Sequence, residues 1–363
     1  SRLAPELGAA EAEAGDLARR IPNPAHPSVP AGGEEDGEVL RVVGGAIGPP
    51  PLDHAEIGER LGLVDSARGV KVSGSRFAFL MREAVLVQLA LVQWVMGRVV
   101  GQGFVPVVPP VLVLEETMEA SGFFPTDRAQ VYGVGSAGAG AAEEGGEREL
   151  YLVGTSEVPL AGLHVDEILD EADLPLRYAG LSTCFRREAG TYGKDTRGIF
   201  RVHQFDKVEM FSYAHPGRSS EEHEALLAVE ESIVSDLGLP YRVVAMAAGD
   251  LAAAASKKYD LEVWLPSEGR YREITSCSNY TDYAARRART RCRAGGGQAS
   301  GGTTRPVHTL NGTACAVART LVYIFEHYQD EGGALVVPEV LRPYCGFDRV
   351  EPGPRPLPAG PWR

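Results

Sequence analysis

The residues best suited to chemistry lie in one charged segment, residues 185–209. Two alternating stretches flank a glycine-bearing connection at residues 190–198, which is the pattern of two antiparallel strands joined by a long loop. Arginines and glutamates stand beside Phe and Val at both edges of this loop, although charges are expensive to bury. The segment therefore predicts a hairpin that grips a nucleotide.

Cationic and aromatic side chains of this hairpin suit a nucleoside phosphate. Arg186 and Arg201, expected on opposite strands, carry guanidinium forks that match phosphate oxygens. Phe205, expected on the same strand face as Arg201, offers a ring for stacking on a base, and Glu188 can accept from an exocyclic amine. Arg319, on the expected final helix, adds a third cation.

Oxygen ligands for a divalent cation are expected on a later strand, at Glu273 and Ser276. Arginines and a magnesium ion together would neutralise a triphosphate during displacement at its α-phosphorus. Each charged residue taken singly is equally explained as an ordinary surface ion pair. Ordinary surface ion pairs explain the whole set less well, because these charges recur in order on a hairpin, on a strand pair and on a helix.

Several strands and helices must position these residues. Alternation predicts further strands at residues 39–43, 103–110, 150–153, 258–265 and 271–276. Helical spacing predicts helices at residues 54–63, 77–100, 158–169, 219–237 and 313–329, with a capping box at Ser219 and Glu222. Because strands that are neighbours in sequence outnumber crossover units, the sequence predicts an α+β fold with a mainly antiparallel sheet flanked by helices.

The N-terminal region differs from the rest of the chain in its sequence pattern. Residues 7–20 predict a helix that ends at Pro22, and residues 21–30 form a proline-dense connector. We therefore expect a boundary near residue 40, with one region over residues 1–40 and a second over residues 41–363. Low-complexity inserts are expected at residues 135–146 and 294–304.

Composition and absent motifs exclude several classes. The net charge of −13 argues against a protein that coats nucleic acid along its whole surface. The five scattered cysteines predict reduced thiols and no zinc site, and no apolar run is expected to approach the length needed to cross a membrane. No G-x-G-x-x-G that opens a helix after a strand is expected, and no P-loop motif is present, so a Rossmann or P-loop nucleotide site is not expected.

Three segments resemble the class II aminoacyl-tRNA synthetase motifs: residues 103–110, residues 185–205 and residues 312–319. The runs at residues 155–160, 193–198 and 201–209 resemble the seryl-tRNA synthetase family in particular. The resemblance covers about residues 7–352. It implies that residues 1–40 are the remnant of an N-terminal coiled-coil arm that grasps tRNA, followed by a class II catalytic domain.

The resemblance also implies roles for individual residues. The implied ATP site contains Arg186, Arg187, Glu188, Arg201, Val202, Phe205, Glu273, Ile274, Thr275, Ser276 and Arg319. The implied serine site contains Thr155, Ser156, Glu157, Arg186, Glu209, Asn311 and Thr313. Arg186, Arg319 and Glu273 would be catalytic, and Glu273 and Ser276 would hold Mg²⁺ through ATP. Glu209 and Thr313 would read the serine hydroxyl.

The implied activity is ATP-dependent activation of L-serine and its transfer to tRNA(Ser). The implied protein is a cytoplasmic homodimer that associates through residues 103–110, without membrane contact. A second reading is a synthetase-like paralogue that makes seryl-adenylate or seryl-tRNA for a specialised biosynthetic pathway or a carrier rather than for translation.

Overall fold

The computed structural model describes residues 3–135, 148–190, 193, 195, 197–293 and 303–353. The predicted inserts at residues 135–146 and 294–304 lie almost wholly outside these ranges, as do parts of the loop at residues 193–198 and the tail beyond residue 353.

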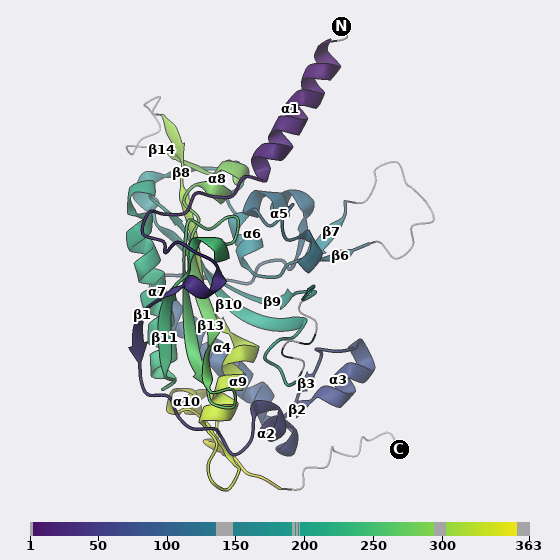
Figure 1. The fold of residues 1–363 in the computed structure, drawn as a ribbon, viewed down its shortest axis with the longest axis vertical. Helices are drawn as coiled ribbons and strands as arrows, with labels where there is room; N and C mark the ends of the chain where they lie inside the picture. The colour runs from purple at the N-terminus through teal and green to yellow at the C-terminus, as the bar shows by residue number, and fades with distance from the viewer. Residues whose placement is uncertain are drawn as a thin grey trace.

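An eight-stranded sheet forms the centre of the described chain (Figure 1). Its strands follow the order β1 (Glu38–Val43), β11 (Tyr241–Ala245), β12 (Lys257–Leu265), β13 (Arg270–Asn279), β16 (His308–Ala316), β10 (Gln204–Ala214), β9 (Leu176–Phe185) and β4 (Val105–Val107). Neighbouring strands are antiparallel except β4 and β9, which run parallel. The predicted α+β class with a mainly antiparallel sheet is confirmed.

Alternation along the central strands separates an apolar face from a polar one. Val208 and Met210 of β10 belong to the main core, whereas Lys207 and Glu209 line a cavity on the other side. Successive residues of a strand point to opposite faces. One strand therefore contributes to the core and to the candidate site at the same time.

Helices cover both faces of the sheet. α4 (Glu83–Gly101), α7 (Ser219–Asp236) and α9 (Val317–His327) pack on the apolar face and supply Leu91, Leu226 and Phe325 to the main core. α6 (Glu157–Ala161) and α8 (Tyr283–Ala288) pack on the other face around Tyr213, with α5 (Glu115–Ser121) against them.

Close approach of α6 to the sheet depends on a glycine in β9. A Cβ atom at Gly180 would stand 2.9 Å from Ser156 Cβ and 3.0 Å from Leu160 Cδ1. Because glycine has no Cβ, α6 lies directly against β9. This contact fixes the position of Thr155 and Glu157, which flank Ser156.

The remaining elements surround this central unit. They are α1 (Leu3–Arg19), α2 (His54–Arg60), β2 (Val64–Asp65), α3 (Ser66–Ser73), β3 (Phe79–Leu80), β5 (Leu112–Leu114), β6 (Tyr132–Val134), β7 (Leu150–Leu152), β8 (Ile168–Asp170), β14 (Arg291–Arg293), β15 (Thr304–Pro306), β17 (Leu335–Val336), α10 (Arg342–Cys345) and β18 (Arg349–Val350), together with short 3₁₀ turns.

The N-terminal helix α1 extends away from the sheet at the top of Figure 1, and it agrees with the helix predicted over residues 7–20. The proline-dense connector that follows is neither helix nor strand. Asn23 docks it, because its Nδ2 donates to the carbonyls of Ala254 at 2.9 Å and Tyr280 at 2.8 Å. β1, which crosses residue 40, pairs with β11 of the main sheet.

The helix predicted over residues 77–100 starts later than expected. α4 begins at Glu83, because Phe79 and Leu80 form β3 and pair with β2. Val85 and Leu89 lie in the predicted helix but are exposed, and the stripe that faces the core contains Val87, Leu91 and Val95. α4 is therefore apolar on both faces.

This two-sided character corrects one expectation. Within the described ranges, α4 is the one helix long and apolar enough to cross a membrane, so the prediction that no run reaches that length was wrong. Length and composition are weak evidence for a membrane, since the core helix of a folded protein can have both. Val87, Leu91 and Val95 of α4 are fully buried in the main core.

Two predicted segments belong to other structures. Residues 150–153 were expected in the main sheet, but β7 pairs with β5 and β6 in a separate small sheet. The helix predicted over residues 158–169 ends at Ala161, and β8 forms at its far end.

One helix start was also misplaced, and one predicted helix cap is absent although its helix, α7, begins at Ser219 as expected. The segment from Thr313 to Ala316 belongs to β16, and α9 begins at Val317. The capping box predicted at Ser219 is absent: Ser219 Oγ contacts His308 Nδ1 at 2.7 Å, and the Glu222 carboxylate accepts from Arg177 Nε at 2.7 Å.

Candidate active site

A cavity of about 390 Å³ opens on the polar face of the sheet, walled by β10, β12, β13, β16, α6 and the loop after β9. Most site residues expected from the sequence line it: Thr155, Glu157, Arg186, Glu188, Arg201, Val202, Phe205, Glu209, Glu273, Ile274, Thr275, Ser276, Asn311, Thr313 and Arg319.

Two of the expected residues do not line the cavity. Arg187 is exposed and its backbone N–H donates to the Gln130 carbonyl at 2.9 Å. Ser156 is buried under α6, where its Oγ lies 2.7 Å from Ser182 Oγ. Ser156 therefore supports the wall of the cavity from outside it.

One end of the cavity is a buried polar pocket with two carboxyl groups. Asn311 Nδ2 donates to Glu157 Oε2 and to Glu209 Oε1, each at 2.8 Å. Thr313 Oγ1 lies 3.4 Å from both carboxylate oxygens of Glu209, and Tyr280 OH donates to Asn311 Oδ1 at 3.0 Å. All five residues are buried. The pocket suits a small ligand that carries an ammonium group and a hydroxyl.

Lys207 adds a buried cation to this end, and the sequence reasoning missed it. Its Nζ forms an ion pair with Glu209 Oε2. The signal was present, because Phe205, Lys207 and Glu209 alternate along one strand and must share a face. Lys207 and Asn311 together hold the Glu209 carboxylate in one orientation.

The carboxyl group of Glu157 is unusual in its acidity. The pKa of Glu157 is raised to about 8, chiefly by burial and also by the nearby Glu209, while Lys207 opposes the shift. At neutral pH this carboxyl therefore retains its proton for most of the time. A ligand ammonium group would favour the ionised form, so its binding would release a proton.

Arg186 stands between the acidic pocket and the rest of the cavity. Its Nε donates to the Gly154 carbonyl at 3.2 Å, and its guanidinium lies 5.5 Å from the Phe205 ring centroid. Its backbone N–H donates to the backbone carbonyl of His203 at 2.9 Å, and this bond continues the hairpin pairing beyond the end of β9. The Arg186 side chain is therefore held next to a ring that can stack on a base.

A second cationic region surrounds Phe200, which was not expected from the sequence. The guanidinium groups of Arg272 and Arg319 lie 4.2 Å and 5.2 Å from the Phe200 ring centroid. Arg319 Nη1 also donates to Glu273, at 3.0 Å to Oε2 and 3.2 Å to the backbone carbonyl. Arg319 is thus positioned from two sides.

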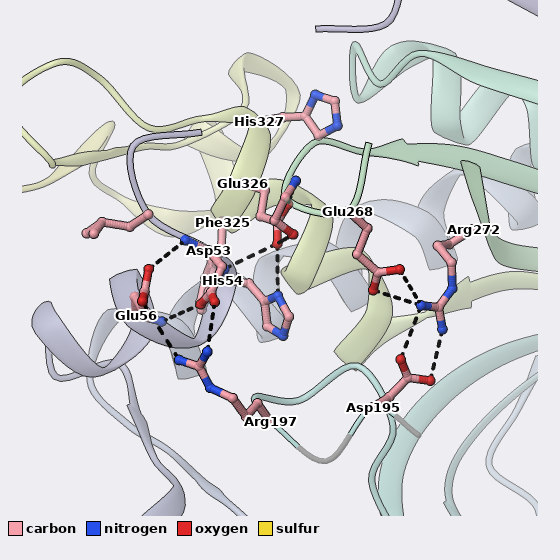
Figure 2. A network of polar contacts seen from close by, with 12 residues as sticks. Asp53, His54, Glu56, Asp195, Arg197, Glu268, Arg272, Phe325, Glu326 and His327 are labelled. Atoms are coloured by element: carbon pink, nitrogen blue, oxygen red, sulfur yellow. Dashed lines mark hydrogen bonds and ion pairs between the residues drawn. The ribbon is translucent and has the colours of Figure 1, made fainter. Parts of the chain in front are cut away.

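The hairpin differs from its predicted form at the loop. Arg186 and Arg201 lie just outside β9 and β10 rather than on opposite strands. Arg201 Nη1 donates to Glu188 Oε2 at 2.7 Å, and Arg201 Nε donates to Asp195 Oδ2 at 3.2 Å. Asp195 also accepts from Arg272 Nη2 at 2.9 Å (Figure 2). One carboxylate thus holds two arginines, Arg201 and Arg272.

The same loop is anchored to α2 on its other side. Arg197 Nη1 lies 3.4 Å from Asp53 Oδ2 (Figure 2). The adjoining His54 contacts Glu326 of α9, with 2.9 Å between Nδ1 and Oε1. The N-terminus of α2 thus connects the loop to the helix that carries Arg319.

Oxygen atoms that suit a hard cation gather at Glu273. Burial opposes ionisation of Glu273, but Arg319 and Lys258 outweigh it and lower the pKa of this carboxyl. Ser276 pairs across the strands with Asp260, which is itself paired with Lys258 at 3.0 Å. The carboxylate oxygens of Glu273 and the hydroxyl oxygen of Ser276 are ligands of the kind that Mg²⁺ prefers. The described residues contain no group of three or more His, Cys, Asp or Glu side chains arranged around a metal position, so ligand oxygens would have to complete the shell.

Comparison with known proteins relates this geometry to one family. Residues 141–328 match the tRNA synthetase class II core domain (G, H, P, S and T). The serine–tRNA ligase of Streptomyces coelicolor is 49% identical over 350 residues, which is 95% of this chain and 78% of that protein. The chain belongs to the serine–tRNA ligase family. The resemblance inferred from the sequence motifs is therefore confirmed.

Solved structures of seryl-tRNA synthetases share the fold as well. The Pyrococcus horikoshii enzyme in complex with ATP matches with a TM-score of 0.89 and 41% identity, over 97% of this chain and 81% of that one. The Naegleria fowleri cytoplasmic enzyme in complex with AMP matches with a TM-score of 0.86 and 35% identity, over 96% and 80%. The class II catalytic fold is thus common to this chain and to nucleotide-bound members of the family.

Proposed function

We propose that this enzyme activates L-serine with ATP, releases pyrophosphate and transfers the serine to the 3′ end of tRNA(Ser) in translation. The observation that carries the proposal is the bridge that Asn311 makes between Glu157 and Glu209. It closes a cavity whose other walls carry arginines and an aromatic ring. Membership of the serine–tRNA ligase family supports the same reaction.

Serine recognition is assigned to the acidic pocket. Glu157, tethered where its backbone N–H donates to Thr155 Oγ1 at 3.2 Å, would bind the ammonium group. Glu209 and Thr313 would bind the hydroxyl. Alanine would leave these buried polar groups unpaired, which disfavours its binding. We also propose that threonine and larger side chains are rejected by their volume.

ATP recognition is assigned to the remaining walls. Glu188 would accept from the adenine amine, Phe205 would stack beneath the base and Arg319 would cover its other side. Arg201 would bind phosphate. Among the other residues expected at ATP, Val202, Ile274 and Thr275 line the cavity, whereas Arg187 does not.

The reaction needs no nucleophile from the protein. An oxygen of the serine carboxylate attacks the α-phosphorus of ATP, and the bond to the pyrophosphate oxygen breaks. Arg186, between the two binding regions, would orient the carboxylate and neutralise the α-phosphate. The tRNA 3′ hydroxyl then attacks the carbonyl carbon of the seryl-adenylate, and AMP leaves.

A magnesium ion would be held by Glu273 and Ser276 together with phosphate oxygens. The ion supplies charge neutralisation on the triphosphate. Glu273 is suited to this because its neighbours keep it ionised. In this arrangement the carboxylate would be shared between the ion and Arg319, which already donates to it.

We further propose a homodimer that associates through residues 103–110 and α4. Exposed apolar side chains support it: Leu86 and Leu89 on α4, Val105 on β4 and Val108 after it, of which Val108 is 82% exposed. Large apolar side chains gathered at one surface indicate a protein contact. We assign the enzyme to the cytoplasm, in keeping with five cysteines that are all described and all free.

Serine-dependent exchange of pyrophosphate into ATP, followed by charging of tRNA(Ser), tests the proposal. We expect exchange with serine and not with alanine or threonine, and charging of tRNA(Ser) by the full-length protein that carries the tRNA-binding arm. Exchange without charging would contradict the tRNA step and favour a paralogue that passes seryl-adenylate elsewhere. No exchange would contradict the proposal as a whole.

A further inference from the structure

Glu230 is a fully buried carboxyl group that the proposed reaction does not use. It lies on α7, which crosses the face of the sheet opposite the cavity. Thr275 Oγ1 donates to its Oε2 at 3.2 Å. Its Oε1 is buried and has no hydrogen-bond partner among the described residues. Buried polar atoms without a hydrogen-bond partner are rare in folded proteins, so this carboxyl group calls for a structural or functional explanation.

The sheet is irregular above this carboxyl. β13 and β16 pair only at Cys277–Gly312, Ser278–Asn311 and Asn279–Leu310, and they are unpaired beyond that point. Register also shifts between β12 and β13 and between β10 and β16, in each case next to cavity residues. Bulges of this kind aim side chains at functional sites. Three neighbouring strand pairs thus become irregular where the cavity opens.

Glu230 lies under the point where β13 and β16 part. It is bonded to Thr275 of β13 on one side, and the backbone of Thr313 of β16 faces it on the other. A Cβ atom at Gly312 would stand 2.8 Å from its Oε1, so only glycine leaves room for the carboxyl at that position. Glu230 therefore contacts both strands at the place where their own hydrogen bonds end.

Its charge state suits this role. Burial raises the pKa of Glu230 well above its ordinary value, and the carboxylates of Glu209 and Asp260 add to the shift. A neutral carboxylic acid can both donate and accept, and it avoids repulsion from Glu209 on the other face of the sheet.

We propose that Glu230 is a positioning residue for serine recognition. Through Thr275 and the backbone at Thr313 it holds β13 and β16 in their separated arrangement from behind the sheet. This fixes Thr313 opposite Glu209, to which it is paired in register. The inference rests on the proposed function, since Glu209 and Thr313 are the residues assigned to the serine hydroxyl.

The test compares Glu230→Ala with Glu230→Gln, which keeps a neutral polar group of the same shape. The matched control is Glu231→Gln on the same helix, where the native residue pairs with exposed Arg41. Pyrophosphate exchange gives KM for serine and KM for ATP separately, and a thermal melt reports folding. Glu230→Ala should raise KM for serine about tenfold, as expected for a displaced hydrogen-bonding group, and leave KM for ATP within about threefold. Glu230→Gln and the control should stay within about threefold for both.

Several outcomes would overturn the proposal. Unchanged KM for serine in a folded Glu230→Ala would do so, as would equal rises in both KM values. A lower melting temperature with both KM values intact would indicate a purely structural role. If Glu230→Ala does not fold, Thr275→Val tests the same link, and a normal KM for serine would then contradict it. Wild-type protein without serine-dependent exchange would instead remove the proposed function on which the inference rests.

Discussion

The Glu188 carboxylate accepts a hydrogen bond from Arg201 Nη1 at 2.7 Å, so the residues proposed for the adenine amine and for phosphate contact each other directly. Both are largely buried in this pair. ATP bound as proposed would therefore compete with this charge-assisted hydrogen bond for both residues. The same arginine is also held by Asp195, which keeps it close to Arg272.

Replacing Arg201 should weaken nucleotide binding more than serine binding. We expect Arg201→Ala to raise KM for ATP about tenfold to a hundredfold in pyrophosphate exchange, because a charged donor to phosphate is lost. KM for serine should change little. Arg197→Ala is the matched control, since Arg197 is an exposed arginine of the same loop that contacts Asp53 instead. Equal effects of the two variants would contradict the assignment.

Removal of the Glu209 carboxylate should abolish serine selection. We expect Glu209→Ala to lower serine-dependent exchange by about a hundredfold or more, while the affinity for ATP in calorimetry stays within about threefold. Because Lys207 would lose its buried partner, Glu209→Gln is needed as a milder variant that keeps a hydrogen-bonding group. Normal serine activation in a folded Glu209→Ala would show that another residue reads the hydroxyl.

Serine activation should depend on pH through Glu157. Its pKa of about 8 in the folded protein means that ionisation, and with it ammonium binding, increases as the pH rises. We expect kcat/KM for serine to rise roughly tenfold per pH unit below pH 7 and to level off near pH 8. Glu157→Gln should remove this inflection and lower kcat/KM. A flat profile for the wild type would contradict the prediction.

The same shift has the opposite sign for stability. The folded state binds the Glu157 proton more tightly than the unfolded state, where the pKa is 4.5. Glu157 should therefore lower the free energy of unfolding as the pH rises from 4.5 towards 8, and Glu157→Gln should remove that contribution.

The exposed apolar face should govern assembly. Leu89 is 58% exposed on α4, and we expect Leu89→Asp to convert a dimer into monomers in analytical ultracentrifugation. Val72→Asp is the control, because Val72 is 69% exposed on α3 and lies outside the proposed contact. A dimer that persists in Leu89→Asp would place the contact elsewhere.

Much of the fold was predictable because its strands are neighbours in sequence. The pair at residues 258–265 and 271–276 alternates and is joined by a short turn, and it appears as β12 and β13. The hairpin at residues 185–209 was predicted in the same way, with strands that end sooner on the loop side than expected. Local pattern was sufficient where the partner strand is the next one along the chain.

The sequence was insufficient where distant segments decide the outcome. The run from Thr313 to Ala316 contains small residues that also suit a helix, and pairing with β10 makes it a strand. Lys258 and Tyr280 enter the cavity from strands and loops far from the hairpin, with no local signal. The role proposed for Glu230 depends on two strands and a helix that only the tertiary fold brings together.

Strand β4 lies between the proposed dimer contact and the wall of the site. Its Val107 pairs with Gly180 of β9, and the Gly180 carbonyl lies 3.4 Å from Ser156 Oγ at the start of α6. A shift of β4 at the proposed dimer contact would therefore reach this wall and the neighbouring Glu157. Assembly of the two copies and recognition of serine are thus expected to be coupled through β4 and β9.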